Sequence, residues 1–190
     1  MLAVAFALDD TLAAATESVD PVALRFAQEA GLDALRAVEA QRIAPRPGAL
    51  RVVRELEALA VPLAVLAPGP ADAARRTAEL VWFAGPVVVG EHPDGIPAPS
   101  AFAALCADFA LPAECVWYVT GRAEADARAA CSAGVQGVFI DAAATDPPEP
   151  DARGLRRVAA IGDVLDLLRG PYTRSALNMR YLMRTVLDWS

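Results

Sequence analysis

The chain has 190 residues, of which 55% are hydrophobic and 22% charged. This is enough for one well-buried domain with a small insertion or tail, and it argues against disorder. The formal net charge of −7 and the pI near 4.7 disfavour nucleic acid and an anionic membrane surface as partners, because both would repel the protein. All seventeen basic residues are arginine, which excludes any mechanism that needs a lysine and is typical of a high-GC bacterial genome.

The cysteines and the single histidine do not form a metal-binding pattern. Cys106, Cys115 and Cys131 contain no C-x-x-C pair, and His92 has no ligand spacing to them, so no metal site is predicted. We expect the cysteines to be small buried hydrophobes in a reducing cytoplasm. The amino terminus lacks a basic leader and no apolar run reaches membrane-spanning length, which predicts a soluble cytoplasmic protein.

Short apolar runs alternate with amphipathic stretches along the chain. The runs are apolar on both faces, as expected for strands covered by helices on both sides. Strand and helix repeated in this order predict an α/β fold with a parallel, doubly wound, Rossmann-like sheet. The predicted strands are 2–8, 62–67, 86–90, 115–120, 137–141 and 157–161. The predicted helices lie within 47–60, 70–80, 100–110, 122–134 and 161–170, with Gly134 as a stop signal.

Two segments do not follow this alternation of strands and helices. Residues 14–44 read as a small helical cap insertion, with two helices broken at Gly31 and begun at Asp20 and Asp33. Residues 170–190 read as a C-terminal helical extension beyond a Gly-Pro pair, and a Pro- and Asp-rich loop precedes the last strand. The predicted core therefore comprises residues 1–13 and 45–169.

The residues that follow each predicted strand are those in which a functional site is expected, because an open α/β sheet binds ligands beyond the carboxyl ends of its strands. The segment "FALDDTL" at 6–12 resembles the first motif of the haloacid dehalogenase superfamily. "RPGALRVVRELEALAVPLAVLAPGP" is similar to its second motif region, and the segment from "GIPAPSAF" to "GVFID" is similar to its third and fourth. The resemblance covers most of residues 1–169.

In that family an aspartate attacks a phosphoryl group and a second aspartate, two residues later, acts as acid and base. A hydroxyl and a lysine hold the phosphate, and an acidic pair after the fourth strand helps to bind magnesium. The nucleophile must be a carboxylate so that an acyl phosphate can form. The cations offset the charge of the transferring group, and magnesium requires oxygen ligands.

Most of the positions that the resemblance assigns to chemistry carry unsuitable residues here. The acid/base position is kept at Asp9 and the distal acidic residue at Asp126. The lost positions are the nucleophile at Ala7, the phosphate hydroxyl at Ala67, the phosphate lysine at Ile96 and the metal carboxylate at Gly121. The resemblance thus implies the fold without the activity, and it implies no cofactor and no metal.

The polar residues that remain allow two interpretations. Asp9, Asp10 and Thr11 either form a small polar site or shape the turn and cap a following helix, and the structural role is favoured. Arg122 and Asp126, spaced i,i+4, are expected to form a surface pair. His92, in the polar turn "GEHPDG", is expected at the surface, where it could act only as an isolated acid or base.

Two functional hypotheses follow. The first is a non-catalytic haloacid-dehalogenase-like protein that acts through a protein partner or as a homodimer. The second is a repurposed enzyme or small-molecule binder that uses Asp9 with Arg122 or Asp126 in a magnesium-independent reaction, with Asp10 as a further candidate. The first is favoured, and the predicted tail helix offers an apolar interface through Leu177, Tyr181, Met183 and Trp189.

Overall fold

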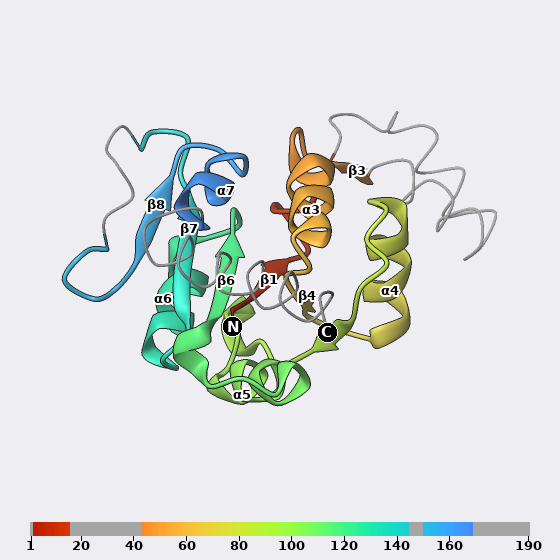
Figure 1. Cartoon of the computed structure of the whole chain (residues 1–190). Coiled ribbons are helices and arrows are strands. Elements are labelled where there is room, and N and C mark those ends of the chain that lie inside the picture. The colour runs from red at the N-terminus through yellow and green to blue at the C-terminus, as the bar shows by residue number, and fades with distance from the viewer. Residues whose placement is uncertain (1, 16–42, 145–149, 169–190) are drawn as a thin grey trace, which may run out of the picture.

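The computed structural model describes residues 2–15, 43–144 and 150–168 (Figure 1). The helices predicted around Gly31, part of the loop before the last strand and the predicted tail helix lie outside these residues. The division into core, cap and extension therefore stays a prediction.

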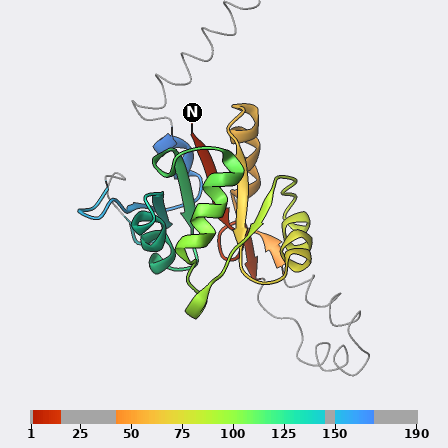
Figure 2. The same ribbon diagram turned by 90° about the horizontal axis from the view of Figure 1, so that it is seen from below.

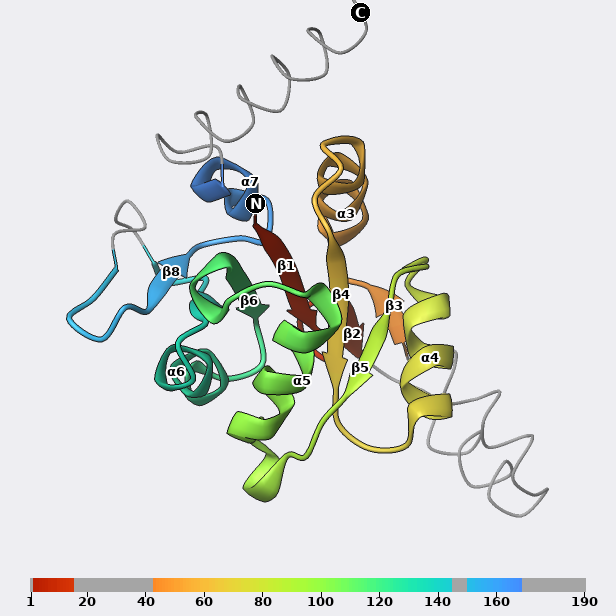
Figure 3. The same ribbon diagram turned by 60° about the horizontal axis from the view of Figure 1, so that its bottom comes forward.

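The core is a sheet of six parallel strands, and this confirms the predicted α/β architecture (Figure 3). β1 lies in the interior of the sheet between β4 and β6, and Phe6 is in register with Val65 on one side and Val119 on the other. The strands in spatial order are β5 (Val87–Val89), β4 (Leu63–Ala67), β1 (Ala3–Ala7), β6 (Val116–Thr120), β7 (Gln136–Ile140) and β8 (Arg156–Val158).

Helices cover both faces of this sheet. α3 (Ala49–Ala58), α4 (Ala71–Leu80) and α7 (Asp163–Leu168) contribute buried residues to a hydrophobic cluster on one face. α5 (Pro99–Phe109) and α6 (Glu124–Ser132) contribute to a second cluster on the other face, which Figure 2 shows from outside. The predicted helices are thus confirmed wherever the structure describes them, and α6 ends just before Gly134, whose φ of 82° is the left-handed conformation of a helix stop.

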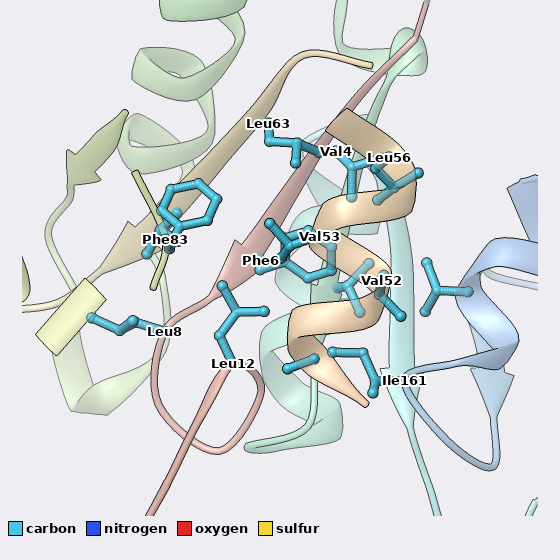
Figure 4. Packing of buried hydrophobic residues seen from close by; sticks show 14 of the residues in the cluster. Val4, Phe6, Leu8, Leu12, Val52, Val53, Leu56, Leu63, Phe83 and Ile161 are labelled. Carbon is cyan, nitrogen blue, oxygen red and sulfur yellow. The ribbon is translucent and has the colours of Figure 1, made fainter. Parts of the chain in front are cut away.

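β1 supplies side chains to both clusters because successive residues of a strand point to opposite faces. Val4 and Phe6 pack under α3, where Figure 4 places them beside Leu56 and Val53. Ala5 and Ala7 belong to the cluster under α5 and α6. All five residues of the strand are buried, so the sheet interior fixes the position of its carboxyl end.

A pair of short strands was not predicted from the sequence. β2 (Ala13–Ala15) and β3 (Ile43–Pro45) run antiparallel, with Ala13 opposite Pro45 and Ala15 opposite Ile43. Alanine is depleted in strands and three alanines show no alternation, so the sequence carried no strand signal there. The strands nevertheless place Arg46, the residue after β3, close to the turn that follows β1.

Some expectations from the sequence are wrong in detail. Cys106, Cys115 and Cys131 are only partly buried, although Cys106 packs against the cluster under α5 and the Cys131 sulfur lies beside Gly137 of β7. The last strand begins at Arg156 and ends at Val158, earlier than expected. Within the described residues, no helix has the length and apolar character needed to cross a membrane.

Candidate functional site

The candidate site lies where the carboxyl ends of β4, β1 and β6 meet. These three strands are neighbours in the sheet and parallel, so the residues that follow them gather at one edge. Ala67 ends β4, Ala7 ends β1 and Gly121 follows β6. The structure therefore brings together three of the positions to which the family resemblance assigns chemistry.

Two of these strand ends are part of the hydrophobic core. Ala7 is 5% exposed and Ala67 is 1% exposed, and each packs within one of the two hydrophobic clusters. A methyl group offers neither a nucleophile nor a hydrogen bond. Nothing in these two side chains can attack, hold or orient a substrate.

The turn after β1 is built around Thr11. Its fully buried hydroxyl accepts a hydrogen bond from the Gly121 N–H at 2.7 Å and donates one to the Asp9 carbonyl at 3.3 Å. Thr11 thus joins the turn after β1 to the turn after β6. The expectation that Asp9 to Thr11 cap a following helix is wrong, because β2 follows the turn.

Asp9 is a candidate carboxylate of this turn whose pKa is perturbed. Its side chain reaches solvent, but the surrounding protein removes part of its hydration and raises its pKa above the ordinary value. Repulsion from Asp10 adds to this effect, while Arg122 and His92 oppose it. Groups from three different strand ends therefore act on this one carboxylate.

Arg122 and Asp126 form an ion pair whose carboxylate is fully buried, which corrects the expected surface pair. The Nε and Nη2 groups of Arg122 donate to the two carboxylate oxygens of Asp126, both at 2.8 Å. The Asp126 side chain is 0% exposed and that of Arg122 28%. The hydrogen bond to Asp126 is the main reason why the pKa of Arg122 is raised. The i,i+4 spacing is the same for a surface pair and a buried pair, so only the fold could distinguish them.

Arg122 also connects the turn after β6 to the loop after β5, because its Nη2 donates to the Gly95 carbonyl. The next residue, Ile96, occupies the position that the resemblance gives to a phosphate-binding lysine, and it is 36% exposed. In the same loop His92 is half-buried rather than at the surface. Its Nδ1 lies 2.8 Å from the Gly90 carbonyl, which orients the ring.

Arg46 is a residue of this edge that the sequence analysis missed. Its backbone N–H donates to the Leu12 carbonyl at 2.8 Å, and its guanidinium donates to the Asp10 carbonyl. The guanidinium also lies directly beside Gly121. An arginine before a Pro-Gly pair in a loop carries no local signal for this placement, which depends on the unpredicted pairing of β2 with β3.

Tyr118 is a second missed residue, buried on β6 two positions before Thr120. Its ring packs edge-on against Phe102, with centroids 5.2 Å apart at 80°, and burial raises the pKa of its phenol. Asp126 lies close enough to raise that pKa further. Tyr118 thus lies within electrostatic reach of Asp126, and its burial favours the protonated phenol.

The residues at this edge do not fit a magnesium site. Ala7 and Gly121 supply no side-chain oxygen, the carboxylate of Asp126 is held by Arg122, and a guanidinium occupies the space beside Gly121. Across the described ranges, no three His, Cys, Asp or Glu side chains are grouped so that they could hold a metal ion.

An open pocket of about 460 Å³ lies away from this edge of the sheet, between α4 and the segment that enters β5. It is lined by Arg75, Glu79 and Phe83 among others.

Solved structures share this arrangement of strands and helices. An L-2-haloacid dehalogenase superposes with a TM-score of 0.64 at 19% identity, over 90% of this chain and 99% of the other. This chain has the fold of the haloacid dehalogenase superfamily. A haloacid dehalogenase-like hydrolase from Streptococcus pneumoniae gives 0.61 at 15% identity over 88% and 98% of the two chains. A superfamily hydrolase from Deinococcus radiodurans, with bound phosphate and sodium, gives 0.60 at 16% identity over 88% and 95%.

No family sequence model and no curated protein matches the chain. At these identities the likeness establishes the haloacid dehalogenase-like fold and nothing about activity. Any activity has to be inferred from the residues at the strand ends.

Proposed function

We propose that the protein is a non-catalytic member of the haloacid dehalogenase-like fold, which acts by binding or regulating a protein partner rather than by hydrolysing phosphate esters or haloacids. The observation that carries the proposal is the apolar character of the ends of β1 and β4. Ala7 and Ala67 are buried methyl groups at the positions where the family resemblance requires a nucleophile and a phosphate-binding hydroxyl.

Two polar residues that remain at this edge, Asp126 and Thr11, support the proposal because they already have structural partners. Both oxygens of Asp126 accept hydrogen bonds from Arg122, and the Thr11 hydroxyl is shared between Gly121 and Asp9. Groups held in this way stabilise the turns and are not available to move protons for a substrate.

The proposal is tested by assaying the purified protein for hydrolysis of p-nitrophenyl phosphate with magnesium, and for halide release from a short 2-haloacid. We expect no turnover above the buffer blank, because loss of a nucleophile alone lowers rates by on the order of 10⁴ to 10⁶. Ala7→Asp alone is not expected to restore turnover, because the hydroxyl, the lysine and the metal carboxylate would still be missing. Magnesium-dependent hydrolysis that survives Asp9→Asn would show that the positions have been assigned wrongly.

A repurposed site is the second candidate, and the environment of Asp9 is the observation that favours it. Its carboxylate reaches solvent, has a raised pKa, and lies within electrostatic reach of Arg122 and His92. Asp126 is a weaker participant because Arg122 occupies both of its oxygens. A substrate-dependent activity that Asp9→Asn abolishes, without an effect of magnesium, would favour this candidate over the first.

The partner surface is proposed from the sequence alone. The apolar residues between 174 and 189, which include Tyr181 and Trp189, lie outside the described residues, and a homodimer is the simplest assembly that they could support. The test is to truncate the chain after Gly170 and measure its mass in solution and its melting temperature. A smaller assembly that stays folded supports an interface. An unchanged assembly state would contradict it.

A further inference from the structure

The space beside Gly121 is occupied by a cation that belongs to the chain. The backbone of Arg46 is fixed at both sides, since its N–H donates to the Leu12 carbonyl at 2.8 Å and its carbonyl accepts from Ala49 at 2.9 Å. From this anchored backbone the guanidinium reaches the Asp10 carbonyl. One side chain thus connects the segment after β3 with the turn after β1, next to the turn after β6.

Glycine at 121 is what makes this placement feasible. A Cβ atom on residue 121 would fall well inside van der Waals contact with Nη1 of Arg46 and with the Asp10 carbonyl oxygen. Gly121 has no left-handed φ, so its backbone conformation does not itself require glycine. The need for a residue without a side chain comes from the guanidinium and the carbonyl.

The Asp10 carbonyl explains why a cation is suited to this place, because its oxygen carries a partial negative charge and accepts from the guanidinium. Arginine is suited to such a position because it stays charged at any pH that the fold tolerates, and its several N–H donors lie in a rigid plane.

We propose that the guanidinium of Arg46 takes the place of a metal ion at this edge of the sheet, as a permanent cation seated against the Asp10 carbonyl in the space that Gly121 leaves open. It holds together the turns after β1 and β6 and the base of the strand pair β2–β3. This role is one of positioning and does not depend on whether the protein turns over a substrate.

The first test is a double-substitution cycle on thermal unfolding with Arg46→Ala and Gly121→Ala. We expect Gly121→Ala to lower the melting temperature by several degrees in the wild-type background, because its methyl group collides with the guanidinium. In the Arg46→Ala background this loss should fall to about half or less, because one of the two obstacles is gone. An equal loss in both backgrounds would overturn the proposal.

Arg54 is the matched control, since it is an exposed arginine whose ion pair with Glu57 at 2.9 Å lies on α3, away from the strand ends. Arg54→Ala should leave the cost of Gly121→Ala unchanged. If Arg54→Ala relieved that cost as much as Arg46→Ala does, the effect would be one of net charge, and the proposal would fail.

The second test asks whether the guanidinium and a metal exclude each other. The pair Ala7→Asp and Gly121→Asp adds two oxygen ligands, and is prepared with and without Arg46→Ala. We expect magnesium to raise the melting temperature above an ionic-strength control only when Arg46 is removed. An equal rise with Arg46 present, or no rise in either protein, would overturn the proposal. If either protein does not fold, the double-substitution cycle alone tests the proposal. Neither experiment measures phosphate hydrolysis, so their outcome is independent of the proposed loss of activity.

Discussion

Neighbouring strands end differently at the same edge of the sheet. β1 and β4 end in methyl groups that belong to the hydrophobic core, whereas β6 runs into a buried polar group formed by Thr120, Arg122 and Asp126. The first arrangement buries side chains that have no polar atom, whereas the second pairs the Asp126 carboxylate that it buries with Arg122. The difference shows which side chains at this edge can be replaced without leaving a buried polar group unpaired and which cannot.

An alanine at a strand end needs no partner, so position 7 can change without leaving an orphaned group. A buried carboxylate such as Asp126 has no such freedom, because removal of either member of its pair leaves an uncompensated charge or an unfilled space. The contrast leads to three predictions on stability, taken in order of decreasing effect.

The largest effect is expected for Asp126→Ala. This change leaves the Arg122 guanidinium partly buried without its counter-charge, and should lower the free energy of unfolding by about 3 to 5 kcal/mol. Glu57→Ala, which removes one member of an exposed pair on α3, should change it by less than about 1 kcal/mol. Chemical denaturation followed by circular dichroism measures both. Similar losses for the two variants would contradict the assignment of Asp126 as buried and paired.

Thr11→Val should have an intermediate effect. Valine keeps the shape of the side chain but removes the acceptor of the Gly121 N–H bond at 2.7 Å. The loss is expected to be about 1 to 3 kcal/mol, the cost of leaving a buried donor unsatisfied. Thr11→Ser keeps the hydroxyl and serves as the control. Equal destabilisation by serine and valine would contradict a stabilising role for the Thr11 hydroxyl.

The smallest effect concerns Asp9, and its sign depends on pH. Because the folded-state pKa is raised above the ordinary value of 3.8, the protonated carboxyl favours folding, fully below pH 3.8 and progressively less as pH rises through the folded-state pKa. Asp9→Asn removes this titration. The melting temperature of the wild type, minus that of the variant, should therefore fall between pH 4 and pH 7. The corresponding change in the free energy of unfolding should be less than about 1 kcal/mol, because solvent screens this partly exposed carboxylate. A difference that grows with pH would mean that the pKa is lowered.

Much of the fold could be predicted from the sequence because strands covered on both faces are continuous apolar runs. Val4 and Phe6, like Leu63 and Val65, carry that signal themselves, and it requires no knowledge of the partner strand. The pairing of β2 with β3 could not be found in this way. Ala13–Ala15 has no periodicity of its own, and becomes a strand only because Ile43–Pro45 lies opposite.

The sequence predicted which positions lie at the candidate site, but it did not predict the contacts that their side chains make. Ala7, Ala67 and Gly121 were placed correctly at neighbouring strand ends, because parallel strands bring these positions to one edge. The burial of Asp126 and the placement of Arg46 were not foreseen. Both depend on the contacts that a long side chain makes with distant segments of the fold. The neighbouring residues in the sequence do not encode these contacts.

The Arg122–Asp126 pair bears on how such proteins change over evolutionary time. Substitution of Asp126 would be opposed by selection with or without a reaction to preserve, because the variant unfolds more readily. An acidic residue at this position therefore serves folding whether or not the protein has an activity. Its presence alone is weak evidence for catalysis.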